Sequence, residues 1–425
     1  MKEKIFKQMW FHRRQNSWIF LEMIIISFFL WKAVDPIYTL ASINNLDKGY
    51  NPDRAFIIDL RTTGDDKVEV MESFNRIMDA LRLDPMVDKV AIVNRGINNG
   101  SSMSTMMRCK SDKTDSWVML GWGRVHQNHA QDYLDIMEYR DMDTGYPPVI
   151  DRSIPISDIC FITKMAAAKL FPDGSNPVGQ KLYVSEKIRP IIAGVLDDVM
   201  TSFGTYNPFA LHFPFSDNYN VFEAYEIIVK TKAGVDAERF KNTFMENKVP
   251  QLTDENIIVI GVESQEQVYS NARASMGVDG QVRLQYMLSF FFIACAFLGI
   301  AGTIWMKCNS RRSEIGLYRA MGSTKKGILG MFCTESATLV TVAYLIALVP
   351  LVIIVLGNNH FMFTTEHFDT TIDNTSPYLY KRFLPHFGIV SLITYAILMG
   401  TAFIGTYITV HKYSNLQPSE ALREE

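Results

Sequence analysis

The 425-residue sequence lacks the motifs by which a chain would carry out chemistry alone. No Gly-x-x-x-x-Gly-Lys-Ser/Thr phosphate loop occurs, and the glycine-bounded segment 322–327 has a spacing that cannot cradle a triphosphate. No acidic pair or Ser/His/Asp constellation stands in a context that supports catalysis. We therefore predict that the chain is not an enzyme, has no catalytic residues and binds no cofactor.

The chain is also poor in cysteine and in metal-ligand patterns. Five cysteines in a chain of this size do not form a disulfide framework, and no CxxC or Cys/His spacing occurs. Cys109 and Cys160 fall in a hydrophilic region, where a disulfide and two free buried thiols both stay open. His126 and His129 lie three residues apart, but the polar stretch around them favours two solvated histidines. We predict no metal site.

The chain also has no large excess of positive or negative charge, since its formal net charge is only −3. No basic tract with interleaved aromatic residues occurs, so nothing indicates a nucleic-acid partner. Hydrophobic residues make up 48% of the chain, and they are unevenly spread. Residues 35–280 are mixed in character, whereas apolar runs dominate the rest of the chain. This segregation indicates a globular domain joined to a membrane part.

Four apolar runs are long enough to span a membrane, because about 20 apolar residues cross the hydrocarbon layer. They are Trp18–Val34, Tyr286–Met306, Ile328–Leu356 and Phe387–Val410. Glu22 and Lys32 interrupt the first run, which a cleavable signal peptide would also explain. Asp35-Pro36 follows it in place of a small-residue cleavage site, so we expect an uncleaved anchor.

Basic residues collect on one side of these runs. They flank the first run at its N-terminal side, outnumber the single acid Glu314 in the connector 307–326, and recur in the tail. The positive-inside rule then places both termini in the cytoplasm. The expected order is N-terminus and first span (1–34), extracytoplasmic domain (35–280), second span (281–306), connector (307–326), third span (327–357), extracytoplasmic loop (358–386), fourth span (387–410) and cytoplasmic tail (411–425).

The extracytoplasmic domain is predicted to be a mixed α/β domain. Two stretches repeat a strand, helix, strand order, which suggests a split β-α-β subdomain. The first comprises Ala55–Leu60, Val70–Leu83 and Val87–Val93, and the second comprises Tyr225–Thr231, Asp236–Asn247 and Asn256–Val262. Residues 100–220 are richer in Gly, Pro, Ser and Asn, and we expect a less regular insertion there.

The connector is the most specific signal in the chain. Residues 311–321 can form about three helical turns, with Ile315, Tyr318 and the neighbourhood of Met321 along one side. Gly322 is a natural helix stop. An ordinary loop that only fixes topology would need the basic residues but not the apolar Ile-Gly-Leu-Tyr pattern between them. We therefore expect a small amphipathic element that is presented to a partner in the cytoplasm.

Two acidic residues lie inside the predicted spans. Glu22 and Glu335 are costly in lipid and are functional candidates for that reason. Each also lies within a turn or two of the cytoplasmic interface, to which its side chain could extend. The second interpretation is favoured for Glu22, and both stay open for Glu335.

Three segments together resemble one known family. Glu314–Ser323 resembles the Glu-Ile-Gly-x-x-Arg-Ala-x-Gly-Ala signature of MacB/FtsX-type ABC transporter permeases, and Glu335 matches a glutamate that continues it. The tail Gln417–Arg423 is similar to the family's terminal Pro-x-x-Ala-Leu-Arg. Residues 129–139 and Ala166–Val195 resemble the family's periplasmic core region. The first span and residues 196–225 depart from the pattern, which leaves the substrate open.

The resemblance implies a permease subunit of the inner membrane, with ATP hydrolysis in a separate ATPase subunit. The connector would be the coupling helix that docks on this ATPase, through Arg311, Arg312, Glu314, Ile315, Tyr318, Arg319, Met321 and Gly322. A second permease copy, as a homodimer or a paralogous heterodimer, would complete the complex, and a periplasmic adaptor with an outer-membrane channel could join it. ATP-driven motion of the periplasmic domain would drive export or efflux. The alternative is a non-transporting signalling subunit that regulates a cell-wall hydrolase or senses a periplasmic ligand.

Overall fold

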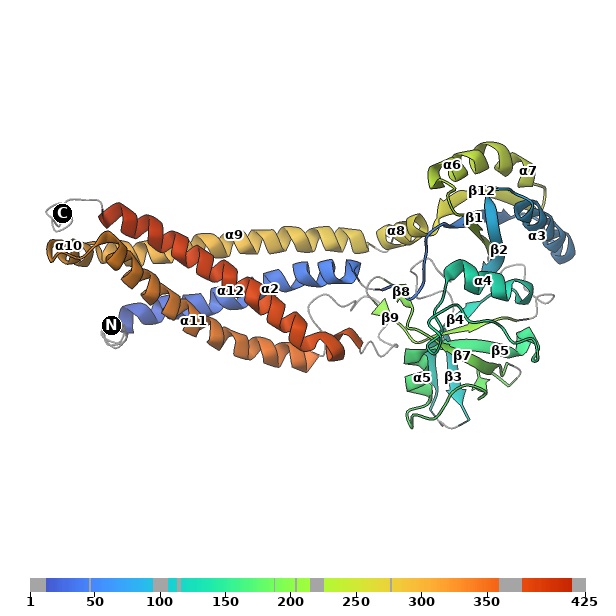
Figure 1. Ribbon diagram of the computed structural model, residues 1–425, viewed down its shortest axis with the longest axis horizontal. Coiled ribbons are helices and arrows are strands. Elements are labelled where there is room, and N and C mark those ends of the chain that lie inside the picture. Colours follow the sequence, from blue (N-terminus) through green and yellow to red (C-terminus); the bar gives the residue numbers. More distant parts are fainter. Residues whose placement is uncertain are drawn as a thin grey trace. The chain divides into compact units, whose positions relative to one another are not determined.

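The computed structural model describes residues 13–45, 47–94, 106–112, 116–186, 188–202, 205–214, 225–275, 277–358 and 377–414. The chain divides into two compact units (Figure 1). The helical unit takes in the chain up to Asn44 and most of the chain from Gly280 onwards. The α/β unit comprises Asn45–Asp279, together with a short later segment. Each unit is described separately below.

Four long helices make up most of the helical unit. They are α2 (Arg13–Asn44), α9 (Val278–Ser310), α11 (Lys325–Asn358) and α12 (Pro377–Ser414). Within the described ranges, these are the four helices that are long and apolar enough to cross a membrane. The expected four-span architecture, with an α/β domain between the first and second spans, is therefore confirmed.

Two helices extend beyond the apolar runs that predicted them. Helix α2 continues past Val34, the last residue of the predicted first span, and runs through Pro36 as far as Asn44. Helix α12 begins at Pro377, so residues 377–386, expected in the extracytoplasmic loop, are helical. An interior proline is tolerated in a spanning helix where neighbouring helices surround the freed backbone groups. The rest of that loop, 359–376, lies outside the described residues.

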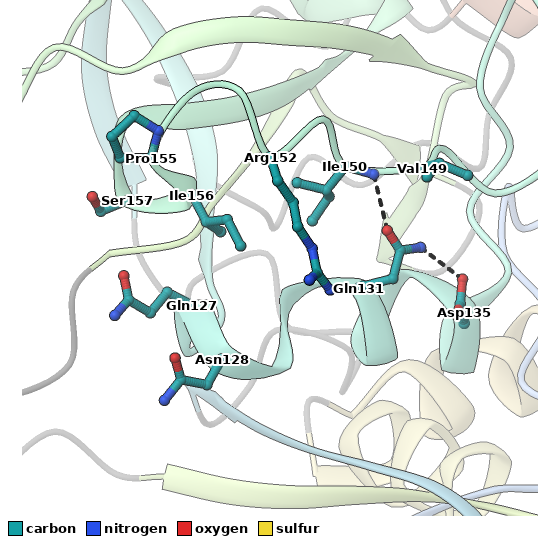
Figure 2. Close-up of a pocket in the computed structure, with 10 residues that line it drawn as sticks. All are labelled: Gln127, Asn128, Gln131, Asp135, Val149, Ile150, Arg152, Pro155, Ile156 and Ser157. Atoms are coloured by element: carbon teal, nitrogen blue, oxygen red, sulfur yellow. Dashed lines mark hydrogen bonds between the residues drawn. The ribbon is translucent and has the colours of Figure 1, made fainter.

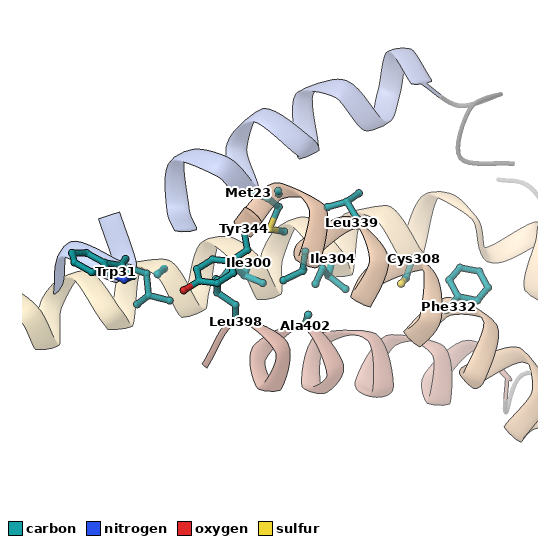
Figure 3. Packing of buried hydrophobic residues seen from close by; sticks show 14 of the residues in the cluster. Met23, Trp31, Ile300, Ile304, Cys308, Phe332, Leu339, Tyr344, Leu398 and Ala402 are labelled. Atoms are coloured by element: carbon teal, nitrogen blue, oxygen red, sulfur yellow. The ribbon is translucent and has the colours of Figure 1, made fainter. Parts of the chain in front are cut away.

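A continuous apolar core joins the four long helices (Figure 3). Trp31 of α2, Ile300 of α9 and Tyr344 of α11 are buried in it. Hydrogen bonds between polar groups also connect these helices. Trp31 Nε1 donates to Ser391 Oγ at 3.1 Å, and Tyr344 Oη donates to the Ser391 carbonyl at 2.7 Å. Ser391 of α12 thus fixes its helix to two others.

The first sheet of the α/β unit carries the predicted β-α-β repeats. Its strands are β1 (Ala55–Thr62), β2 (Val87–Asn94), β11 (Tyr225–Thr231) and β12 (Ile257–Ser264), in the order β12-β1-β11-β2. Strand β11 is antiparallel to both β1 and β2, so β1 and β2 run parallel with β11 between them. Strand β12 is likewise antiparallel to β1. The two repeats interlock as split β-α-β units, which confirms the predicted subdomain.

Helices cover one face of this sheet (Figure 1). Helix α3 (Lys67–Arg82) begins where the Asp66 carboxylate accepts hydrogen bonds from the Val68 and Glu69 amides. Its predicted apolar stripe is buried against the sheet, as Val70, Phe74, Ile77, Met78 and Leu81. Helix α6 (Ala237–Thr243), a π-helical turn (Phe244–Lys248) and α7 (Val249–Leu252) cover the rest.

A second sheet occupies the region that we expected to be an irregular insertion. Its strands are β3 (Met106–Ser111), β4 (Val118–Arg124), β5 (Ile159–Thr163), β6 (Leu182–Tyr183), β7 (Ile191–Leu196) and β10 (Phe209–His212), in the order β6-β3-β4-β10-β5-β7. Helix α5 (Lys164–Leu170) packs on one face of it. The expectation failed because several strands are very short and their connections carry the Gly and Pro residues. A separate pair, β8 (Met200–Ser202) and β9 (Thr205–Tyr206), lies beside it in sequence.

A shared core links the two sheets around helix α4 (Ala130–Met137). At the C-terminal end of α4, the buried Lys230 ammonium donates to the carbonyls of Asp135 and Ile136 at 3.1 and 3.0 Å. The same ammonium is paired with Glu138, which lies in the left-handed backbone region at φ 50°. A cation at this end of a helix opposes the partial negative charge of the unpaired carbonyls. Lys230 therefore fastens α4 to β11. Helix α8 (Gln265–Ser275) follows the first sheet in the chain.

Candidate functional site

The connector folds as helix α10 (Arg312–Ala320), between α9 and α11. Its end is set by Gly322, whose φ of +86° is a backbone conformation that residues with a side chain rarely adopt. Thr324 Oγ1 then accepts from the Gly327 amide at 3.1 Å and caps the start of α11. The expected helix and its glycine stop are both present. The connector is therefore a short helix with defined ends.

A buried ionic cluster ties the connector to the third span. Glu335 of α11 pairs with Lys307 of α9 at 3.0 Å and with Arg311 at 2.6 Å. Arg311 also donates to Glu314, at 2.6 Å from Nη2 and 2.9 Å from Nε. Its guanidinium lies over the Phe332 ring, 4.8 Å from the ring centroid. Two cations thus share one carboxylate, and Glu314 supplies the second negative charge.

The ion pairs of this cluster are largely buried and hold the connector to the third span. The side chains of Lys307, Arg311 and Glu335 are 9%, 11% and 10% exposed. Charges so far from water are tolerated only when they are paired, and removal of one partner leaves the others uncompensated. Glu335, which the sequence left open between a functional residue and one that extends to the interface, faces α9 and the connector. The cluster thus links α9, the connector and α11 through Lys307, Arg311 and Glu335.

The outward surface of the connector differs from the one that periodicity suggested. Ile315, expected among the contact residues, is fully buried in the helical core, and Arg311 is committed to the cluster. Tyr318 and Arg319 are half-buried. The exposed apolar side chains are Leu317 and Met321, at 50% and 64%. Sequence reasoning missed Leu317 because three turns of helix leave the orientation of the buried face undecided.

Lysines border this exposed apolar pair. Lys325 and Lys326, at the start of α11, are exposed, as are Ala320 and Gly322. Arg312 and Glu314 are partly exposed. An apolar pair with a basic border is a surface that an acidic, grooved partner can bind. We call Leu317, Ala320, Met321, Lys325 and Lys326 the connector surface.

The long helices contain further pairs of polar side chains. Glu22 Oε1 accepts from Thr303 Oγ1 of α9 at 2.9 Å, so this carboxylate has a partner within the helical unit. His386 Nε2 of α12 lies 2.8 Å from Asp35 Oδ1 of α2, and both side chains are almost fully buried. The Tyr38 ring packs edge-on against His386 at 4.8 Å. Sequence reasoning missed this pair because it placed Asp35 outside the first span.

The α/β unit clarifies the histidines and cysteines. His126 and His129 are buried and not solvated as expected, with ring centroids 5.1 Å apart. Arg82 Nη2 donates to His129 Nδ1 at 3.2 Å. Burial, reinforced by His126 and Arg82, lowers the pKa of His129 to about 3. Among the described residues no group of three or more His, Cys, Asp or Glu side chains could hold a metal ion.

Both hydrophilic-region cysteines are buried as free thiols. Cys109 of β3 and Cys160 of β5 belong to the apolar core beneath α5. Burial raises the pKa of the Cys109 thiol to about 12 and raises the pKa of Cys160 too. A thiol that stays protonated at neutral pH is a poor nucleophile. These side chains pack in the apolar core beneath α5.

Comparison with known proteins identifies the membrane part. Residues 286–418 match the model of the FtsX-like permease C-terminal family, and this segment contains the connector with the helices on both sides of it. No curated protein matches the chain.

Two solved structures are similar to the chain over about half its length. One is a domain of a putative permease protein from Porphyromonas gingivalis, with a TM-score of 0.33, 14% identity, and coverage of 50% of this chain and 91% of that chain. The other is the periplasmic region of MacB from Actinobacillus actinomycetemcomitans, with a TM-score of 0.34, 12% identity, and coverage of 54% and 97%. By its four apolar helices and its family match, the chain is a multi-pass membrane protein whose residues 286–418 match the FtsX-like permease C-terminal family.

Proposed function

We propose that the chain is the permease subunit of an ABC transporter of the inner membrane, driven by a separate ATPase that docks on helix α10. The observation that carries the proposal is the family match over 286–418, which includes α10 and both adjoining helices. The sequence has no phosphate loop, so ATP would be hydrolysed by a partner. Both chain termini and the connector would face the cytoplasm, as the positive-inside rule predicts.

Docking would use the connector surface. Leu317 and Met321 are one turn apart on the outward face of α10, a spacing at which two side chains enter one groove. Lys325 and Lys326 would add a favourable interaction with an acidic rim. The buried Ile315 and the ion pair between Arg311 and Glu314 would hold α10 in place, and these residues would not touch the ATPase. Fewer residues would therefore contact the ATPase than the eight that the sequence suggested.

The buried cluster would carry motion from the ATPase into the membrane part. A docked ATPase that moves α10 would pull on Arg311, and the pairing with Glu335 would pass that displacement to α11. Two permease copies in the complex would let ATPase closure draw the paired helices together. Motion of the α/β unit, and with it export or efflux, would follow. A signalling subunit that moves no substrate would use the same docking and the same path.

The docking assignment can be tested by co-purification from native membranes. The double variant Leu317→Asp, Met321→Asp places two charges where we expect an apolar contact. It should lose most of the ATPase that co-purifies with the wild-type chain, since desolvating an unpaired carboxylate is unfavourable. The matched control is Val68→Asp, Leu83→Asp, which changes two exposed apolar residues in the α/β unit. ATPase recovery equal to that of the control would show that α10 does not dock there.

A further inference from the structure

A polar groove opens in the α/β unit beside helix α4, away from the residues used above. It has a volume of 860 Å³ and lies between α4 with its preceding turn η1 (Gln127–His129) and the chain segment 149–157 (Figure 2). Its lining residues are Gln127, Asn128, Gln131, Asp135, Val149, Ile150, Arg152, Pro155, Ile156 and Ser157. Volumes of roughly 300–1,000 Å³ are typical of pockets for small ligands.

The base of the groove is held rigidly by Gln131. Its Oε1 accepts from the Ile150 amide at 2.9 Å, and its Nε2 donates to Asp135 Oδ1 at 2.9 Å and to the Pro148 carbonyl at 3.2 Å (Figure 2). One side chain therefore joins both walls. Asp135 is in turn paired with Lys89 of β2, which neutralises its charge. These contacts hold the two walls together, and the pairing of Asp135 with Lys89 leaves the floor without net charge.

Three polar side chains of the groove have no hydrogen-bond or ion-pair partner among the described residues. Arg152 extends from the 149–157 segment toward α4 (Figure 2), is exposed, and makes no hydrogen bond or ion pair with another described residue. The side-chain amides of Gln127 and Asn128 on the facing wall likewise have no hydrogen-bond partner among the described residues. The neighbouring Asp151 carboxylate does not line the groove and accepts from the amide and hydroxyl of Ser153. The groove thus offers one guanidinium and two amides.

We propose that this groove binds a short peptide carrying a free carboxylate. A guanidinium matches a carboxylate with two parallel hydrogen bonds, and a carboxamide can donate to and accept from a peptide group at once. Val149, which is 85% exposed, lies with Pro155 and Ile156 as an apolar wall for a small side chain. The ten lining residues include no aromatic ring on which a sugar could stack, which favours a peptide over an acidic saccharide.

The test uses the full chain immobilised in lipid nanodiscs. It is exposed to a pool of randomised acetylated tetrapeptides with free C-terminal carboxylates, and to the same pool with C-terminal amides, and retained peptides are quantified by mass spectrometry. The wild-type chain should retain the carboxylate pool at least about tenfold better than the amide pool, since a hydrogen bond to a charged group contributes at this level. Arg152→Ala should remove this preference, and Asn128→Ala should lower retention of both pools.

The matched control is Lys232→Ala, which removes an exposed cation from the same unit outside the groove and should leave retention unchanged. Equal retention of the two pools by the wild-type chain, or an unchanged preference in Arg152→Ala, would overturn the proposal. Retention of oligosaccharides containing glucuronic acid in place of the peptides would overturn the peptide assignment. None of these measurements depends on ATPase docking at α10, so this proposal and the proposed function can fail separately.

Discussion

Glu335 is the residue whose loss should damage the helical unit most. Glu335→Ala removes the carboxylate that Lys307 and Arg311 share, and these side chains are only 9% and 11% exposed. Arg311 would keep Glu314, whereas Lys307 would lose its one ion pair within the described part of the chain. Breaking a buried ion pair from one side costs about 3–5 kcal/mol, because the remaining charge stays buried. In a unit of this size that corresponds to a fall of roughly 6–20 °C in the unfolding temperature.

The assay is thermal unfolding of the purified full chain, followed by the fraction that stays monodisperse after heating. The control is the double variant Lys307→Met, Glu335→Met, which removes the opposite charges together and should recover most of the loss, since a buried pair and an apolar pair of similar size are often equivalent. A fall of less than about 2 °C for Glu335→Ala would refute the reasoning. So would a double variant that is less stable than the single one.

Three further predictions concern other buried contacts. Lys230→Met should destabilise the α/β unit by about 1–3 kcal/mol, measured by chemical denaturation, because two carbonyls at the end of α4 and Glu138 lose their donor; stability equal to the wild type would contradict this. Burial lowers the pKa of His129 from an ordinary value of about 6.5 to about 3, so the unfolded state binds the proton first as the pH falls. Stability should therefore be complete above about pH 6.5 and fall toward pH 3, by up to about 1.4 kcal/mol per pH unit for this group, and His129→Gln should show a shallower fall in the same titration. Asp35→Leu should lower the unfolding temperature of the helical unit because it removes the carboxylate that lies 2.8 Å from Nε2 of the buried His386. The exchange Asp35→His, His386→Asp should restore part of that loss, and no recovery would indicate that the pair is not the stabilising contact.

The sequence predicted the elements whose signals are local. Long apolar runs located the four spanning helices, and the apolar stripe from Val70 to Leu81 located α3, because burial against a single surface imposes a period on the chain. Strands β1, β2, β11 and β12 were found by their β-branched composition and by the turns between them. Their interlocked order depends on pairing between strands that lie far apart in the sequence. The repeated strand, helix, strand pattern suggested it, and the structure supplied the register.

The sequence could not show which side of each helix is buried and which is exposed. In α10, Ile315 and Leu317 are both apolar, and only the packing against α11 and α12 shows that the first is inside and the second outside. Arg311 pairs with Glu335, which lies 24 residues further along the chain, and no local pattern shows this contact. The pairing of Asp35 with His386 spans 351 residues and leaves no local trace. The polar groove likewise combines α4 with a segment that has no regular structure of its own.

We propose that a separate ATPase docks on α10. This docking is tested most directly by placing a photoreactive amino acid at Leu317 or at Met321 and irradiating intact cells. We predict that the crosslinked product from both positions contains an ATPase subunit. The same probe at Val149, exposed in the α/β unit, should give no such product. An absence of ATPase from the products at both α10 positions, or its presence at Val149 as well, would contradict the account.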